Sequence, residues 1–235
     1  MPGWIPEESL VSRAVSLLQE TTGCTRGASI EIDKRIPLMA GLGGDSSDAA
    51  AVLRGLNELW ELGLSRMELL DMAPQLGSDV VFFLYGGTAL VEGRGEMVTP
   101  IPLLPHRWVV LVVPPVGREP GKTKRLYDSL EVAYFTDGQI TDRLVAVLKT
   151  GGEFTPSLLF NTFDNVTFDR SSELDAHRSH IMKIGAGNIH LAGSGPALFT
   201  LLKDQAEAED LHIRLQQQGM ETYLTDTVTA AEKVE

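Results

Sequence analysis

Residues 37–48 read PLMAGLGGDSSD and lead directly into an alanine- and leucine-rich stretch that ends at Trp60. Apolar residues recur at helical spacing in that stretch, and alanine and leucine are strong helix formers. The sequence therefore predicts a helix with an apolar face that starts at the end of a glycine-rich loop.

A glycine-rich loop before a helix suits a polyphosphate. Glycines let the backbone approach closely, while free N–H groups and the positive end of the helix dipole hold negative charge. Ser46 and Ser47 add hydroxyls that could bond phosphate oxygens or help to hold Mg²⁺. The same residues could instead form a tight turn with a serine N-cap, and on this segment alone that alternative stays open. A dinucleotide loop is disfavoured, because Ser46 stands where its pattern needs a third glycine.

Two elements are predicted before the loop. Apolar residues from Leu10 to Leu18 recur at helical spacing and predict an amphipathic helix. Apolar and polar residues alternate from Ala28 to Asp33, which predicts a half-buried strand.

The helix that follows the loop leads into a second helix and a hairpin. Ser65 and Glu68 have the spacing of a capping box, and we expect the helix that they start to end near Gly77. The apolar runs Val80–Tyr85 and Thr88–Val91 are separated by two glycines, which predicts a β-hairpin.

The second half has the pattern of a β-α-β-β-α-β layer with extra helical material inserted. A proline-marked stretch places the expected boundary near residue 104, so the predicted domains are residues 1–104 and 105–235. Strands are expected at 108–113, 190–192, 198–202 and 222–224, and helices at 123–130 and 205–218. The fold class is therefore α+β with two domains.

The amino-acid composition limits the classes of partner that the protein is expected to bind. The net charge is −12, which opposes general attraction to nucleic acid or to an anionic membrane surface. Cys24 is the single cysteine, so no intramolecular disulfide can form, and the N-terminus has no signal-peptide pattern. We expect a cytoplasmic protein that binds a small molecule.

Three ordered motifs resemble the superfamily of galactokinase, homoserine kinase, mevalonate kinase and phosphomevalonate kinase. They are residues 34–50, which include the loop, residues 77–96, which read GSDVVFFLYGGTALVEGRGE, and residues 191–199, LAGSGPALF. Within the superfamily the match is closest to the kinases of a cytidine-diphosphate-linked methylerythritol. The resemblance implies a ribosomal-S5-domain-2-like N-terminal domain, here incomplete, and a ferredoxin-like C-terminal domain with ATP in the crevice between them.

The resemblance also implies the reaction and its residues. It implies that ATP, with Mg²⁺, phosphorylates the 2-hydroxyl of 4-diphosphocytidyl-2-C-methyl-D-erythritol in non-mevalonate isoprenoid synthesis. The implied ATP-binding residues are Pro37, Leu38, Met39, Ala40, Gly41, Leu42, Gly43, Gly44, Asp45, Ser46 and Ser47. The implied substrate-binding residues are Thr123, Tyr127, Gly193, Ser194 and Gly195. No metal cage built from protein side chains alone is expected; Mg²⁺ would come with ATP, with help from Ser46.

Two of these residues carry the most specific roles, and each has an ordinary alternative. Asp79 matches the catalytic aspartate, which orients the acceptor hydroxyl and takes its proton. It could instead be a turn residue that bonds local amides. Tyr127 falls where an aromatic ring stacks on cytosine, but it could equally be half-buried core.

The chain departs from the family pattern at two places. Asp45 stands where glycine is usual, and its carboxylate should repel a triphosphate unless it points away or meets a cation. The family's opening strand, which carries an active-site lysine and cytosine-binding residues, has no counterpart before Leu10. We therefore expect an edge or a gap in the first domain's sheet. A kinase of another small alcohol and an inactive nucleotide-binding protein remain the alternatives.

Overall fold

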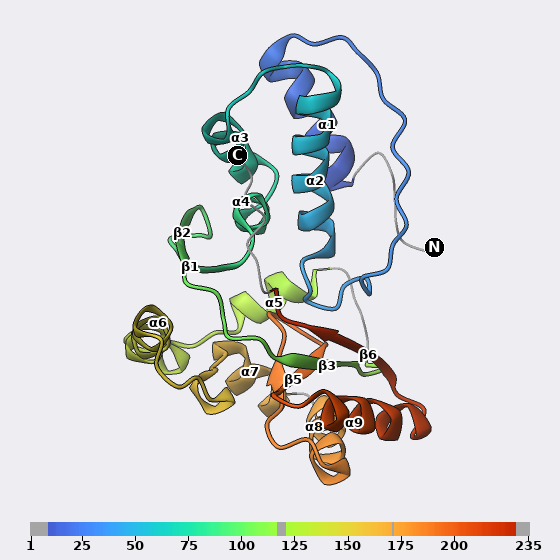
Figure 1. The fold of residues 1–235 in the computed structure, drawn as a ribbon, viewed down its shortest axis with the longest axis vertical. Coiled ribbons are helices and arrows are strands. Elements are labelled where there is room, and N and C mark those ends of the chain that lie inside the picture. The colour runs from blue at the N-terminus through green and yellow to red at the C-terminus, as the bar shows by residue number, and fades with distance from the viewer. Residues whose placement is uncertain (1–8, 117–120, 171, 229–235) are drawn as a thin grey trace. The chain divides into compact units, whose positions relative to one another are not determined.

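The computed structural model describes residues 9–116, 121–170 and 172–228. Their contacts form two compact units, which are described separately below (Figure 1). The first unit contains residues 9–36 and 43–100, and the second contains residues 37–42 and the described residues from 101 onward. A domain boundary at residue 104 stays a prediction.

The first unit is mainly helical. Its elements are α1 (Leu10–Thr22), α2 (Gly44–Leu59), α3 (Arg66–Met72), the short 3-10 helix η2 (Ala73–Gln75), α4 (Ser78–Tyr85), β1 (Thr88–Glu92) and β2 (Met97–Ile101). Helix α2 packs against both α1 and α4. Ala49 and Ala50 of α2 are fully buried, and such small side chains let neighbouring helices approach closely.

Local signals in the sequence set the ends of these helices. The Ser9 hydroxyl accepts from the Ser12 N–H at the start of α1, which ends at Gly23 in the left-handed conformation. The capping box of Ser65 and Glu68 is present at the start of α3, as expected.

The predicted hairpin was partly wrong. Residues 80–85 belong to helix α4, and the hairpin lies farther along, between β1 and β2. Val80, Val81 and Leu84 are buried, which is the spacing of one helix face. A short continuous apolar run fits a buried helix as well as a strand, so periodicity alone could not decide.

The predicted strand from Ala28 to Asp33 was also wrong. This segment has no strand geometry, and Ala28 and Ile30 are exposed. Alternation makes a strand only where another strand offers backbone partners. Within the described residues of the first unit, the sheet contains β1 and β2 alone. The segment is held instead at its start, where the Trp60 indole N–H donates to the Gly27 carbonyl.

The second unit is built on a four-stranded antiparallel sheet. The strands are β3 (Trp108–Val113), β4 (His190–Leu191), β5 (Leu198–Leu202) and β6 (Glu221–Asp226), in the order β4-β5-β3-β6. This is the strand order of the expected ferredoxin-like layer. Every strand predicted for this half is present.

Helices connect the strands of this sheet. They are α5 (Lys122–Asp128), α6 (Gln139–Thr150), α7 (Thr162–Arg170), α8 (Ser172–Ile184) and α9 (Gln205–Gln217), with short 3-10 helices η3 (Val132–Tyr134) and η4 (Pro156–Leu158). Helices α8 and α9 lie on one face of the sheet (Figure 1). Their Ile181, Leu211 and Leu215 pack in one cluster with Val110 and Val112 of β3. In the ranges that the structure describes, no helix is long and apolar enough to cross a membrane.

Candidate active site

The first part of the glycine-rich loop packs against a second glycine-rich segment. We call residues 37–47 the phosphate loop and residues 192–196 the glycine loop. In the second unit, the Ala197 N–H donates to the Ala40 carbonyl at 3.1 Å. Gly41 has φ +79°, and a Cβ there would lie 2.8 Å from the Gly195 nitrogen and closer still to the Ala192 carbonyl oxygen. Only glycine fits at this position, because the obstructing atoms are backbone.

The second part of the phosphate loop starts helix α2 in the first unit. Gly43, at φ 68°, is the N-cap residue, and it has no side chain that could accept from the first N–H groups of the helix. Ser46 and Ser47 lie inside α2 and do not cap it, so the serine N-cap alternative is wrong. The Ser47 hydroxyl donates to the Gly44 carbonyl. The helix therefore begins with N–H groups that can hold an anion.

Lys34 forms an ion pair with Asp45, whose carboxylate would otherwise repel a triphosphate. Its Nζ lies 2.5 Å from a carboxylate oxygen of Asp45 and 2.5 Å from one of Asp48, and 9% of its side chain is exposed. Burial lowers the pKa of Lys34, but hydrogen bonds and charge attraction from the two carboxylates outweigh it, so the pKa is raised overall. Asp45 thus meets a cation, which offsets one of the two negative charges at the start of α2.

Asp79 lies in the first turn of α4, with its side chain exposed. It is therefore a helix residue rather than the turn residue of the alternative reading. Phe83, four residues on, shares its face of the helix. The Phe83 ring packs against Gly43, where a Cβ would lie 2.7 Å from the ring. Asp79 is thus one helical turn from the side chain that contacts the phosphate loop.

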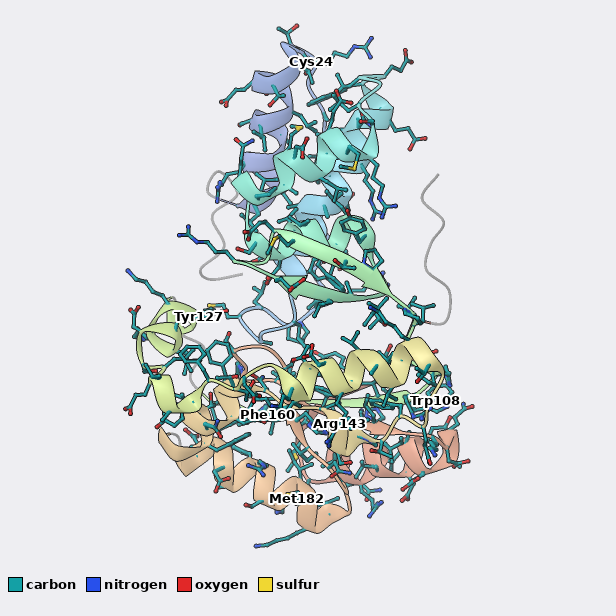
Figure 2. The ribbon with its side chains drawn as sticks, turned by 90° about the vertical axis from the view of Figure 1, so that its left-hand side faces the viewer. Cys24, Trp108, Tyr127, Arg143, Phe160 and Met182 are labelled. Carbon is teal, nitrogen blue, oxygen red and sulfur yellow. The ribbon has the colours of Figure 1, made fainter. Side chains whose placement is uncertain are left out.

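The predicted substrate residues come together in the second unit. Thr123 and Tyr127 lie on α5, and the Thr123 and Ser194 hydroxyls are 3.0 Å apart. Tyr127, which is labelled in Figure 2, is 61% exposed, so it is not core. Its ring meets that of Phe163 edge-on, with 5.0 Å between the ring centroids. An exposed ring with a supported edge can offer its face to a base.

Asn161 is a residue that the sequence analysis missed. Its side-chain amide donates to the Leu191 carbonyl at 3.0 Å and to the Gly193 carbonyl at 2.8 Å. Its side-chain oxygen accepts from the Phe163 N–H, as an N-cap does. Asn161 just before a helix is a recognisable cap signal in sequence. That it reaches a segment some thirty residues away is not.

Asp164, in the first turn of α7, was also missed. Burial raises its pKa to about 6, against the opposing effects of the Arg178 charge and a hydrogen bond from the Leu191 N–H. One of its carboxylate oxygens is buried without a hydrogen-bond partner among the described residues. A buried carboxylate of this kind binds its proton more tightly than an exposed one.

Metal binding by side chains alone has no candidate in the described part of the chain, where no group of three or more His, Cys, Asp or Glu residues could hold an ion. Ser46 lies in the first turn of α2, beside the N–H groups that face the start of the helix. A hydroxyl there can contribute one oxygen to Mg²⁺ that arrives with a nucleotide.

Comparison with known proteins identifies the family. Residues 9–87 match the model of the GHMP kinases N-terminal domain. Over 227 residues, the chain is 48% identical to the 4-diphosphocytidyl-2-C-methyl-D-erythritol kinase of Dehalococcoides mccartyi, covering 97% of the chain and 80% of that protein. The chain belongs to the 4-diphosphocytidyl-2-C-methyl-D-erythritol kinase family. As a member of that family it is a small-molecule kinase, and ATP is the phosphoryl donor of GHMP kinases.

Further matches agree with membership of this kinase family. The enzyme of the same name from Shouchella clausii is 37% identical, over 89% of the chain and 70% of that protein. A crystal structure of 4-(cytidine 5'-diphospho)-2C-methyl-D-erythritol kinase matches with a TM-score of 0.80 at 31% identity, over 95% of the chain and 80% of that structure. Homoserine kinase from Cytophaga hutchinsonii matches with a TM-score of 0.68 at 20% identity, over 96% of the chain and 78% of that structure, which shows a shared fold.

Proposed function

We propose that this chain transfers the γ-phosphoryl group of ATP to the 2-hydroxyl of 4-diphosphocytidyl-2-C-methyl-D-erythritol, a step of non-mevalonate isoprenoid synthesis. The observation that carries the proposal is the phosphate loop at the start of α2, found in a chain 48% identical to a kinase of that name. The proposed site residues are those that the sequence analysis assigned.

The phosphate loop supplies the nucleotide site in this proposal. The free N–H groups at the start of α2 and the positive end of its dipole attract the ATP phosphates. Lys34 reduces the repulsion that Asp45 and Asp48 would otherwise exert on them. Mg²⁺ would be held chiefly by the phosphates, with the Ser46 hydroxyl as a protein ligand, and would neutralise charge on the transferring group.

Asp79 acts as the catalytic base. Its carboxylate accepts a hydrogen bond from the acceptor hydroxyl and orients the oxygen towards the γ-phosphorus. As the new O–P bond forms and the bond to the ADP oxygen breaks, the hydroxyl proton passes to Asp79. Its exposed position in the first turn of α4 leaves the carboxylate accessible to a substrate.

The second unit supplies the cytidyl site. The exposed face of Tyr127 stacks on the cytosine ring, and the T-shaped contact with Phe163 holds the tyrosine ring in place. Thr123 and the glycine loop, through Gly193, Ser194 and Gly195, provide hydroxyl and backbone groups for the polar parts of the substrate. This combination of an aromatic platform and polar groups favours a nucleotide-linked alcohol over a simple one.

An ADP-release assay with purified chain, ATP and Mg²⁺ tests the proposal against its alternatives. Three acceptors are compared: the cytidyl substrate, homoserine and mevalonate. We expect release with the cytidyl substrate alone, and we expect Asp79→Asn to lower kcat by about 10²-fold or more without weakening ATP binding. Release with homoserine or mevalonate would instead favour another small-alcohol kinase. ATP binding without turnover would favour an inactive nucleotide-binding protein, and no ATP binding would contradict the loop assignment.

A further inference from the structure

Strand β4 lies at the edge of the second unit's sheet, next to β5. The Ala192 N–H donates to the Ala197 carbonyl, whereas Leu191 pairs with Leu198 one position earlier. Because hydrogen bonding alternates along an antiparallel pair, Leu191 directs its own N–H and C=O away from β5. Such outward groups on an edge strand need another partner.

The start of α7 provides that partner in place of a neighbouring strand, through the side chains of Asn161, just before the helix, and Asp164, in its first turn. The Asn161 amide donates to the Leu191 carbonyl at 3.0 Å, and the Asp164 carboxylate accepts from the Leu191 N–H. The edge of β4 is thereby fixed to α7 by both of its outward backbone groups.

Asn161 also reaches past β4 into the glycine loop. Its amide donates to the Gly193 carbonyl at 2.8 Å. Gly193 has φ +52°, and a Cβ there would lie 3.1 Å from the Gly41 carbonyl oxygen, so the glycine loop and the phosphate loop approach closely at this point. The bond from Asn161 fixes the peptide plane after Gly193 and therefore the direction of the Ser194 N–H.

The same side chain organises the aromatic part of the proposed cytidyl site. Its oxygen accepts from the Phe163 N–H at 3.0 Å, and the Phe163 ring is the edge-on neighbour of Tyr127. Ser194, the next residue after Gly193, contacts Thr123 of α5. Asn161 is therefore hydrogen-bonded to the backbone on both sides: to the glycine loop and to the start of the helix that supports Tyr127.

We propose that Asn161 is a positioning residue for the cytidyl substrate, because its side chain holds the glycine loop and the Tyr127 platform in a fixed relation. This inference rests on the proposed function for its substrate. Asn161 acts through Gly193 and Phe163, and it takes no part in the chemical step.

Two substitutions of Asn161 distinguish a positioning role from a role in capping α7 alone. Asn161→Ser and Asn161→Asp both keep an oxygen that can cap α7, but both lose the amide donors to Leu191 and Gly193. The aspartate also places a carboxylate beside two carbonyl oxygens. Asn165→Ser and Asn165→Asp make the same chemical changes four residues farther along, within α7, and serve as matched controls.

Amide hydrogen exchange gives a readout that does not depend on activity. We expect the amides of residues 193–195 to exchange about 10-fold faster in both Asn161 variants, and at the wild-type rate in both Asn165 controls. Unchanged exchange at these amides in the Asn161 variants would overturn the proposal, because it would leave Asn161 with a capping role only.

Steady-state kinetics give the functional readout. We expect KM for the cytidyl substrate to rise about 10-fold in the Asn161 variants, with a smaller change in KM for ATP and with kcat largely kept. Equal KM values for wild type and variants would overturn the positioning role. A wild-type chain that fails to phosphorylate the cytidyl substrate would contradict the proposed function, while the exchange measurement would still decide whether Asn161 holds the loop.

Discussion

The phosphate loop and the glycine loop are both rich in glycine, but different forces shape them. The phosphate loop runs into the start of α2 and is flanked by the ion pairs of Lys34 with Asp45 and Asp48. The glycine loop connects two strands and is held by the side chains of Asn161 and Thr123. A glycine-rich loop binds an anion only where free N–H groups and charge support it; elsewhere its glycines serve close packing.

The point where the two loops meet should be the most sensitive to substitution. Gly41→Ala would place a Cβ against the backbone of Ala192 and Gly195, in addition to the strain of φ +79°. We expect loss of measurable ATP binding and a loss of unfolding free energy well above the roughly 1–2 kcal/mol that the left-handed conformation alone costs. Calorimetry and thermal unfolding would measure the two effects.

Two glycine variants control for backbone strain in that experiment. Gly23→Ala meets the same strain at φ +69°, but nothing lies within 4 Å of its Cβ position, so it should lose only the conformational cost. Gly193→Ala, whose Cβ would lie 3.1 Å from one carbonyl oxygen, should fall between the two. If Gly41→Ala were as mild as Gly23→Ala, the close packing of the two loops would be refuted.

Tyr127→Ala tests whether the second unit serves the cytosine rather than ATP. Loss of a base-stacking face costs about 1–3 kcal/mol, so we expect KM for the cytidyl substrate to rise by roughly one order of magnitude. Tyr127→Phe keeps the face and should behave almost as wild type. A rise in KM for ATP instead would place Tyr127 in the ATP site and contradict its proposed role.

Lys34→Met tests the role of charge in the phosphate loop. Without the ammonium, Asp45 and Asp48 repel the ATP phosphates, and we expect the Kd for ATP to rise by about 3- to 10-fold, more at low salt than at high salt. Affinity for the cytidyl substrate should change less. The double variant Lys34→Met, Asp45→Asn should recover part of the lost affinity; no recovery would show that Asp45 is not the source of repulsion.

Asp164→Asn should give the smallest of these effects. We expect the stability of this variant relative to wild type to depend on pH. Because the pKa of Asp164 is raised in the folded state to about 6 from 3.8, its ionisation opposes folding. Its favourable contribution is complete below pH 3.8 and is lost as the pH rises through about 6. The asparagine variant has no such loss, so its stability relative to wild type should increase between pH 4 and pH 7.

Thermal unfolding of both proteins across that range measures the difference. We expect a relative gain of about 2–4 °C in Tm, or ~1 kcal/mol after allowance for solvent screening. The lowered pKa of His190, caused first by its burial, makes both proteins less stable as the pH falls, so that effect cancels in the comparison. Parallel Tm curves would contradict the raised pKa of Asp164.

Much of the fold followed from local sequence signals. The loop before α2, the capping box of α3 and the strands of the second unit were predicted because their signals lie within a few residues. The wrong predictions concern segments whose secondary structure depends on what they pack against. Residues 80–85 form a helix because they pack against α2, and residues 28–33 are not a strand because no described strand pairs with them.

In the candidate site, too, local sequence patterns predicted some residues, whereas contacts between residues far apart in the sequence were missed. Ser194 was assigned by its motif and Tyr127 by its position in the family resemblance, and the structure shows that Tyr127 is exposed. The hydrogen bonds from Asn161 to Leu191 and Gly193 span about thirty residues, and no residue spacing in the sequence predicts them. The cation that accompanies Asp45 was likewise hidden, although Lys34 stands just before the loop.

The most direct test of the proposed phosphoryl transfer is phosphorus NMR of the purified chain with ATP, Mg²⁺ and 4-diphosphocytidyl-2-C-methyl-D-erythritol. We expect one new phosphate monoester signal that grows together with ADP and is nearly absent with Asp79→Asn. Conversion of ATP to ADP and inorganic phosphate without a new ester, or no conversion at all, would contradict it.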